Sequence, residues 1–399
     1  MSDELGYKPF DCDNHYYEAE DAFTRHVPKN MRARCVQWAE IEGRKRHIVG
    51  GKVSYAVTNP TWDPIAKPGS ISDFLRGNPN KLKPEELLSD PEPLPDCYIN
   101  RDARIKTLDE QGLDAMWLFP TLGVLYEELL KHDIEAVRTQ FRAFNRWLDE
   151  DWGCNYQNRI FGSPYITLAD VNFACEELEW AIKQGARTVC MRPSAVWTAD
   201  GPLSPSHPKF DPFWARVNEA GITVVIHASD SGYTTHGYVD DGFSTGGSNA
   251  FSSWAPNIKH FNIERAAYDF LVTLCYEKLF ERFPNLRIAS IENGAEFLPD
   301  LVRKLKQSRD RMATMGYYKE DPVELFKRHV WINPFWEDDV YEVEEIMGAD
   351  RVIFGSDWPH IEGMPTPLDY VPELSKFDDA KKKLILRDNV VALNELNPA

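Results

Sequence analysis

No stretch of the 399-residue sequence approaches the roughly 20 consecutive apolar residues that a membrane-spanning helix requires. Basic residues are also scarce, because 45 Lys and Arg face 63 Asp and Glu and leave a net charge of −18. A charge of this sign repels nucleic-acid phosphates and anionic lipid headgroups. We therefore expect neither nucleic acid nor a membrane as a partner.

The seven cysteines are scattered and contain no CxxC pair. Thiols spaced in this way fit neither a disulfide framework nor a sulfur-ligated zinc. The first ten residues are polar and acidic, so they lack the basic start and the apolar stretch of a secretory signal. These absences predict a cytoplasmic protein with reduced cysteines.

Short apolar segments alternate with helical patterns along most of the chain. This alternation predicts an α/β protein with a parallel sheet, and eight repeats favour a closed (β/α)8 TIM barrel that spans residues 1–399 as one domain. The predicted strands are Pro9–Tyr16, Leu113–Phe119, Ile160–Ile166, Arg187–Arg192, Ile222–His227, Leu286–Glu292, His329–Asn333 and Arg351–Asp357. The predicted helices are Glu127–Asp149, Val171–Gln184, Asp211–Ala220, Glu264–Phe283, Glu296–Met315 and Val340–Met347.

Two connections are too long to be simple loops between a strand and its helix. The first covers residues 18–100 and is rich in Pro, Asn, Asp and Trp, and the second covers 229–260 and is rich in Gly, Ser and aromatic residues. Long loops usually serve as functional lids. Because they follow strands 1 and 5, we expect both at the C-terminal rim, where barrel enzymes keep their active sites. The first insertion fits a subunit contact in a homo-oligomer equally well.

Polar residues stand on or at the end of three of the predicted strands. Alternate side chains of a strand share one face, so Asp11, Asp13 and His15 point the same way. His227 ends the fifth strand and Asp357 ends the eighth. Polar residues at the C-terminal ends of barrel strands are typical of catalytic groups.

Carboxylates and imidazoles that converge in a buried site would be unstable unless a cation lay between them. A divalent metal resolves this conflict. Two carboxylates and two imidazoles suit Zn²⁺, Mn²⁺ or Fe²⁺, of which we expect Zn²⁺ first, and the absence of thiolates argues against a structural zinc. The expected ligands are Asp13, His15, His227 and Asp357. Taken singly, each has an ordinary explanation as a helix cap or a core histidine.

Segments distributed over nearly the whole chain resemble amidohydrolase family 2, the branch of the amidohydrolase superfamily that contains aminocarboxymuconate semialdehyde decarboxylase and the aromatic-acid decarboxylases. The resemblance implies a TIM barrel with a divalent metal on the four residues named above, and it implies that Asp357 transfers protons. A metal lowers the pKa of bound water to about 7 and polarises any oxygen that it contacts. The matching segments are Asp13–His15, Val225–His227, Glu292–Pro299, Phe354–His360 and Asp388–Asn394.

Three positions depart from the pattern of this superfamily. Asp13 replaces a histidine that many members carry on the first strand, and Glu292 replaces a histidine on the sixth. Glu292 could bind a second metal, orient a ligand or shuttle protons. No lysine ends the fourth strand, so we expect no carbamylated-lysine bridge between two metals. A single metal is favoured, while a carboxylate-bridged pair using Glu292, Asp357 and His360 stays open.

Several further residues are candidates for contact with a substrate. Arg192 ends the fourth strand, where a guanidinium would bind a substrate carboxylate or form a structural salt bridge. His360 fits either a substrate contact or a supporting role beside the metal ligands. Trp38 and Trp62 in the first insertion and His236 in the second are candidate pocket walls, for which packing within a lid is the simpler alternative.

We expect an enzyme that hydrolyses or non-oxidatively decarboxylates a small carboxylated substrate, with aromatic acids included. The expected catalytic residues are Asp357, His227, Glu292 and His360. A non-heme iron or iron/manganese oxygenase on the same scaffold is the main alternative, because the ligand set is rich in carboxylates. A non-catalytic subunit that keeps the metal for stability is the third.

Overall fold

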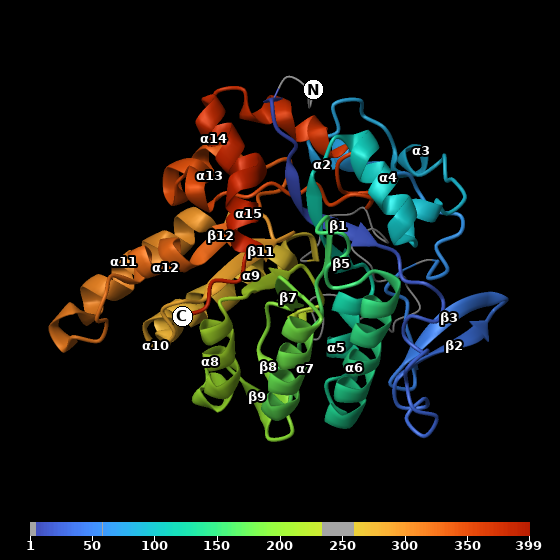
Figure 1. Cartoon of the computed structure of the whole chain (residues 1–399), viewed down its shortest axis with the longest axis horizontal. Helices are drawn as coiled ribbons and strands as arrows, with labels where there is room; N and C mark the ends of the chain where they lie inside the picture. Colours follow the sequence, from blue (N-terminus) through green and yellow to red (C-terminus); the bar gives the residue numbers. More distant parts are fainter. Residues whose placement is uncertain (1–4, 58, 234–258) are drawn as a thin grey trace.

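Parallel strands joined by helices form the centre of the protein (Figure 1). The computed structural model describes residues 5–57, 59–233 and 259–399. One parallel sheet contains, in spatial order, β1 (Phe10–Tyr16), β5 (Ala115–Pro120) and β6 (Ile160–Gly162). The other contains β12 (Val330–Ile332), β11 (Arg287–Ile291), β10 (Thr223–His227) and β7 (Thr188–Met191). Seven of the eight predicted strands are therefore confirmed, with shorter bounds.

These central strands are buried on both faces. Every residue of β5 and β10 is buried, and both strands are largely apolar. Strands of this kind are typical of parallel sheets that helices cover. Figure 1 shows α6 (Ile134–Asp151), α7 (Val171–Lys183) and α8 (Asp211–Ala220) along the outer side of the strands.

The segment 351–357, predicted as the eighth strand, is extended but does not form a ladder. It follows a short turn, η6 (Ala349–Arg351), and it makes only isolated bridges. Two of its amides bind outside the sheets: Phe354 N donates to the carbonyl of Ile385 at 3.1 Å and Ser356 N donates to the Asp11 carboxylate at 2.9 Å. The strand prediction is wrong here because the donors that a ladder needs are used by a C-terminal helix and a side chain.

Single backbone bonds link the edges of the two sheets through irregular segments. The segment that follows β6 contacts β7, and the segment 352–358 contacts both β12 and β1. These bonds join Ile166 N to Cys190 O at 2.8 Å, Ile353 N to Ile332 O at 2.9 Å, Cys12 N to Phe354 O at 2.9 Å and His15 N to Trp358 O at 2.8 Å.

Side-chain caps set several of the helix boundaries. The carboxylate of Asp170 accepts from two amides of the first turn of α7, and Gly221 ends α8 in the left-handed conformation. The predicted helix 127–149 is two helices, α5 (Tyr126–Leu130) and α6, because Asp133 starts a new helix by accepting from Ala136 N. Helices 211–220 and 340–347 (α13, Val340–Met347) were predicted with correct bounds.

The remaining elements are shorter or peripheral. Among the described residues, none of the helices combines the length and the apolar character that a membrane span requires. All seven cysteines are unpaired. The other elements are α2 (Ser72–Leu75), α3 (Pro84–Leu87), η1 (Asp96–Tyr98), α4 (Arg101–Gln111), η2 (Gly123–Leu125), β8 (Val196–Thr198), β9 (Gly201–Leu203), η3 (Pro208–Phe210), α9 (Lys259–Tyr276), α10 (Leu279–Arg282), α11 (Leu298–Met312), η5 (Ala313–Met315), α12 (Pro322–His329), η7 (Pro367–Leu374), α14 (Asp379–Lys383), η8 (Leu384–Asp388) and α15 (Asn389–Leu393).

The segment between β1 and β5 contains a small antiparallel sheet of its own. It is formed by β2 (Val36–Ile41), β3 (Arg44–Val49) and β4 (Lys52–Val53), and it projects to one side of the molecule (Figure 1). Val36 N donates to Gln140 of α6 at 2.9 Å, and His47 Nδ1 lies 2.6 Å from the Tyr126 hydroxyl. These contacts fix the small sheet against the helices that follow β5.

The C-terminal tail lies across the N-terminal ends of β10 and β11. Thr223 donates its hydroxyl to the carbonyl of Leu393 at 2.7 Å, and Arg287 donates to the carbonyl of Glu395 at 2.6 Å. Asn397 N donates to the carbonyl of Gly221 at 3.2 Å. Gly221 has a φ of +59°, and a Cβ at this position would collide with the carbonyl of Asn397.

We predict that Gly221→Ala destabilises the protein by displacing this tail. Gly316→Ala is the matched control, because Gly316 has a φ of +58° and nothing within 4 Å of the added Cβ. Both variants carry the backbone strain, whereas only Gly221→Ala adds the collision, so its unfolding free energy should fall by about 2 kcal/mol more. Urea unfolding followed by circular dichroism measures the difference. Equal losses in the two variants would contradict the role of the tail.

Candidate metal centre

Three of the predicted ligands meet in the core of the protein. Asp13 and His15 lie on β1 and His227 ends β10, and the three residues are 1%, 0% and 1% exposed. The His15 Nε2 atom lies 3.2 Å from Asp13 Oδ1, and the His227 Nε2 atom lies 3.6 Å from the same oxygen. Residues from distant parts of the sequence therefore converge as the sequence predicted.

Glu292 joins this group directly. It follows β11 with a φ of +56°, and its Oε2 atom lies 3.3 Å from His15 Nε2 and 3.4 Å from His227 Nε2. The sequence left three roles open for this residue. The structure places it among the atoms that could ligate the same cation as Asp13, His15 and His227.

Asp357 faces the same nitrogen of His15. Its Oδ1 atom lies 3.3 Å from His15 Nε2 and 2.6 Å from His360 Nδ1. The residue has a φ of +55°, which turns the chain away after the extended segment. Two overlapping groups of donors result, and within each group the ligand atoms lie within 4.8 Å of one another. They are Asp13, His15, His227 and Glu292, and His15, Glu292, Asp357 and His360.

The inner donor atoms fit a divalent cation. Asp13 Oδ1, His15 Nε2 and His227 Nε2 are buried and have no hydrogen-bond partner among the described residues. The other ring nitrogens face carbonyls, with His15 Nδ1 at 3.2 Å from Pro120 O and His227 Nδ1 at 2.9 Å from Ala228 O. A carbonyl holds the proton on that nitrogen and leaves the Nε2 lone pair for a metal.

The spacing of these atoms supports the same conclusion. Metal–ligand bonds of about 2.0–2.2 Å place neighbouring ligand atoms about 3.0–3.6 Å apart. The distances from the Nε2 atoms of His15 and His227 to the neighbouring carboxylate oxygens of the site run from 3.2 to 3.6 Å. Such distances are long for hydrogen bonds between charged groups but normal for the edges of a coordination shell.

The electrostatics of the protein without metal show how strained this arrangement is. Burial disfavours a charged imidazole, yet Asp13 and Glu292 raise the pKa of His15 to about 10. Burial also opposes charge on Asp13, but the neighbouring imidazoles of His15 and His227 outweigh it and lower the Asp13 pKa. Burial, together with Glu292, raises the pKa of Asp357 well above its usual value. A bound cation would replace the protons that these groups otherwise retain.

His360 packs against the metal centre. Its ring centroid lies 3.9 Å from that of His15, and its Nε2 atom lies 3.0 Å from the Thr121 hydroxyl. Burial and the neighbouring His15 lower the pKa of His360 well below its usual value. The ring therefore joins Asp357 to Thr121, a residue that had no distinguishing pattern in the sequence.

The four predicted substrate contacts have different positions. Arg192 is buried and its guanidinium lies 2.5 Å from Glu128 and 3.5 Å from Glu127, so the geometry favours the structural salt bridge. Trp38 donates to the carbonyl of Glu20 at 2.6 Å, and the Trp62 ring lies 4.6 Å from that of Tyr17. Trp38 thus packs within the first insertion, whereas Trp62 packs against a residue that directly follows β1. His236 lies outside the described residues.

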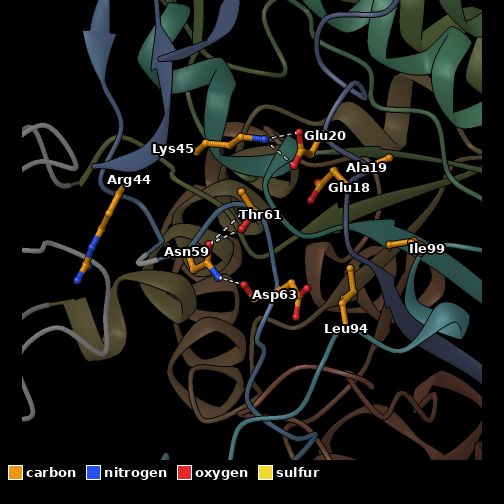
Figure 2. A pocket seen from close by; sticks show the side chains of 10 residues that line it. All are labelled: Glu18, Ala19, Glu20, Arg44, Lys45, Asn59, Thr61, Asp63, Leu94 and Ile99. Atoms are coloured by element: carbon orange, nitrogen blue, oxygen red, sulfur yellow. Dashed lines mark hydrogen bonds and ion pairs between the residues drawn. The ribbon is translucent and has the colours of Figure 1, made fainter. Parts of the chain in front are cut away.

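A cavity of about 880 Å³ lies beside the first insertion (Figure 2). None of the metal donors described above belongs to its lining, which includes Glu18, Lys45 and Asp63. Figure 2 shows Glu18 and Glu20 close together, with Lys45 directed to Glu20 at 2.8 Å. The cavity is therefore a neighbour of the metal centre and not its coordination pocket.

Glu18 is a buried carboxylate at the wall of this cavity. Its Oε1 atom accepts from Leu122 N at 2.7 Å and from Gly123 N at 2.9 Å, while its Oε2 atom has no partner among the described residues. Burial raises the pKa of Glu18 from 4.5 to about 7, although these two amides oppose the shift. Its place three residues after His15 was the one signal in the sequence that could have indicated it.

Comparisons with known proteins point to one family. The sequence model of a family described as Amidohydrolase matches residues 101–393. The solved amidohydrolase map2389c from Mycobacterium avium subsp. paratuberculosis K-10 has a TM-score of 0.90 and 38% identity, and the alignment covers 98% of each chain.

More distant relatives have named activities. A curated gamma-resorcylate decarboxylase from Polaromonas sp. is 24% identical over 315 residues, which is 74% of this chain and 88% of the relative. The solved 5-carboxyvanillate decarboxylase from Novosphingobium aromaticivorans, complexed with manganese and 4-hydroxy-3-methoxy-5-nitrobenzoic acid, has a TM-score of 0.61 and 17% identity. That alignment covers 98% of this chain and 97% of the other.

We predict that Glu18→Gln changes the pH dependence of stability. A carboxylate whose pKa rises from 4.5 to about 7 on folding stabilises the protein below pH 4.5 and loses this contribution as the pH rises through 7. The amide of the variant cannot titrate, so between pH 5 and pH 8 the variant should gain about 2 to 3 kcal/mol relative to wild type. Urea unfolding at both values measures this gain.

The control for this prediction is Glu20→Gln, which removes an exposed carboxylate paired with Lys45. We expect its stability relative to wild type to change by less than about 1 kcal/mol over the same range. The same pH response in both variants would show that Glu18 does not titrate as described.

Proposed function

The chain belongs to the amidohydrolase family, and we propose that it is a metal-dependent decarboxylase of small aromatic carboxylates. At the broader level it is an enzyme of the metal-dependent hydrolase or carboxy-lyase type. One observation carries the proposal: Asp13 Oδ1, His15 Nε2 and His227 Nε2 are buried, converge and lack partners among the described residues. The gamma-resorcylate decarboxylase relative supports the choice of reaction.

We propose Asp13, His15 and His227 as the core ligands, with Asp357 and Glu292 completing the shell. Zn²⁺ was our first expectation. Three carboxylates favour a harder cation such as Mn²⁺, and manganese is bound in the solved 5-carboxyvanillate decarboxylase. We therefore propose Mn²⁺ as the resident metal, with Zn²⁺ and Fe²⁺ as rivals that metal analysis of the purified protein distinguishes. Because the two donor groups share His15 and Glu292, and one imidazole nitrogen binds one metal, we propose a single ion.

The bound metal would polarise a substrate oxygen. Asp357 stands beside that position, since its Oδ1 atom is 3.3 Å from His15 Nε2. In the proposed reaction the bond between the ring and the carboxylate breaks, CO₂ leaves, and the proton of Asp357 occupies the vacated ring carbon. His360, at 2.6 Å from Asp357, orients this carboxyl group.

We infer that the two sheets form a closed (β/α)8-type barrel in which the extended segment 352–358 takes the place of an eighth strand. The bridges Tyr165 to Cys190, Ile332 to Val352 and Asn14 to Trp358 support closure, because they join every free edge of the two parallel sheets. His227, Glu292 and Asp357 lie at the C-terminal ends of their strands or extended segments, as expected for a barrel enzyme. We further propose that 18–100 and 229–260 are insertions over this rim of a single domain.

Other assignments remain proposals on weaker support. Hydrolysis through metal-bound water would use the same ligands, with Asp357 as general base, and it is the second candidate because the family is named for amidohydrolases. The oxygenase and the non-catalytic subunit find no support among the relatives described above. A cytoplasmic location and a homo-oligomer stay predictions, as do substrate contacts from Arg192, Trp38, Trp62 and His236.

We predict that removal of the metal abolishes turnover. Dialysis against a chelator should eliminate CO₂ release from 2,6-dihydroxybenzoate, the ligand of a solved decarboxylase of the same fold, and related hydroxybenzoates. Added Mn²⁺ should restore the rate, because the polarising charge returns. Metal content is measured in parallel. Full activity in metal-free protein would refute the proposed function, whereas metal-dependent amide or ester cleavage without decarboxylation would select the hydrolase.

We predict that Asp357→Asn lowers kcat by about 10²–10⁴-fold at saturating Mn²⁺, because the amide cannot exchange the proton. Saturating metal compensates for any ligand interaction that the variant loses. Asp379→Asn on α14, whose side chain is fully exposed, is the control and should keep the wild-type rate. Circular dichroism should show an intact fold in both variants, and a normal rate for Asp357→Asn would remove this residue from proton transfer.

A further inference from the structure

A buried polar network lies directly behind the metal ligands. Asp11 is the centre of this network, and its side chain is fully buried. Its Oδ1 atom accepts from Asp13 N at 3.1 Å and from Ser356 N at 2.9 Å. Its Oδ2 atom accepts from the Ser356 hydroxyl at 2.6 Å and from Asn14 Nδ2 at 3.0 Å. Each carboxylate oxygen thus binds one donor from β1 and one from the segment that carries Asp357.

The network continues to a buried cation. Arg104 of α4 is 1% exposed, and its guanidinium donates to Asn14 Oδ1 at 2.5 Å and to the carbonyl of His15 at 2.8 Å. A third bond reaches the carbonyl of Cys97 at 2.6 Å, and the guanidinium lies 4.8 Å from the Trp358 ring. Asn14 therefore links Asp11 to Arg104, because its amide nitrogen donates to the carboxylate and its amide oxygen accepts from the guanidinium.

The backbone alone holds these two parts of the chain weakly. β1 and the segment 352–358 share isolated bonds, such as Asp357 N to Asp13 O at 2.9 Å, and no continuous ladder. A Cβ at position 355 would collide with the Asp13 side chain, so glycine permits the close approach. The approach still needs a group that fixes its register. The Asp11 carboxylate supplies four charge-assisted hydrogen bonds across this junction.

We propose that Asp11, with Asn14, Arg104 and Ser356, positions Asp13 and Asp357 and thereby sets the affinity of the metal centre. This inference rests on the proposed metal site. These residues contact no substrate, so they are positioning residues. Groups that orient ligands in this way change metal affinity or activity by about 10- to 100-fold when they are removed. The positive charge of Arg104 also offsets a negative charge that Asp11 would otherwise add to a site rich in carboxylates.

The experiment compares Mn²⁺ binding by wild type, Asp11→Asn, Ser356→Ala and the double variant in the full chain, without substrate. Asp11→Asn keeps the size of the side chain but removes the acceptor for two of the four bonds. Ser356→Ala removes one of the four, the hydroxyl bond to Asp11, together with the bond that the hydroxyl accepts from Trp358 N at 3.1 Å. Thr223→Val is the control, because it removes a buried hydroxyl bond at the opposite end of strand β10. Calorimetric titration gives the affinity, and electron paramagnetic resonance reports the symmetry of the Mn²⁺ site.

We expect Asp11→Asn to bind Mn²⁺ about 10- to 100-fold more weakly with an altered resonance spectrum. Ser356→Ala should show a smaller loss of the same kind, and the double variant should bind no worse than Asp11→Asn, because both changes break one network. Thr223→Val should keep the wild-type affinity and spectrum. Ser356→Ala also serves as the informative variant if Asp11→Asn does not fold.

Wild-type affinity and spectrum in a folded Asp11→Asn or Ser356→Ala would overturn the positioning role. An equal loss in Thr223→Val would also overturn it, since the effect would then follow general destabilisation. Failure of the proposed function has a different signature. If the metal site is wrong, the wild-type protein itself binds no divalent metal. If only the reaction is wrong, the wild-type protein binds Mn²⁺ and the variants differ in affinity, but no substrate is decarboxylated.

Discussion

The structure depends on a cluster of buried carboxylates and imidazoles whose charges a bound cation would compensate. Two imidazoles and three carboxylates from β1, β10, the end of β11 and the segment 352–358 point into one buried space. Without a metal, proton sharing must satisfy them, and it leaves Asp13 Oδ1, His15 Nε2 and His227 Nε2 without hydrogen bonds among the described residues. The folding energy of the surrounding core maintains this unfavourable arrangement, as is common at functional sites.

The irregular parts of the fold have a direct relation to this site. β10 is a regular buried strand, whereas the segment that leads to Asp357 forms no continuous ladder. In that segment Ser356 N donates to the Asp11 carboxylate instead of to a neighbouring strand. Glu292 and Asp357 both have positive φ values, 56° and 55°. Conformations of this kind are costly for residues with side chains. These conformations direct the two carboxylates towards His15. The packing and hydrogen bonds of the surrounding residues hold the backbone in them.

Charge compensation extends beyond the ligands themselves. Arg104 is a buried cation that is linked to Asp11 through Asn14, and Arg192 is a buried cation paired with Glu127 and Glu128. The two arginines balance acidic groups on different sides of the core. Removing one member of such a pair would leave an uncompensated buried charge.

Local patterns in the sequence determined the order of the strands along the chain, the helices 211–220 and 340–347, and the identity of Asp13, His15, His227 and Asp357 as candidate ligands. Hydrophobic periodicity, capping residues and polar strand ends are local signals, so they can be read from the sequence alone. Tertiary structure alone decided that Glu292 lies beside His15 and His227, that Arg192 pairs with Glu127 and Glu128, and that Arg104 and Ser356 bond to Asn14 and Asp11 next to the candidate ligands. These roles depend on which distant groups become neighbours, and a linear pattern carries no information about hydrogen bonds between residues that lie up to 345 positions apart.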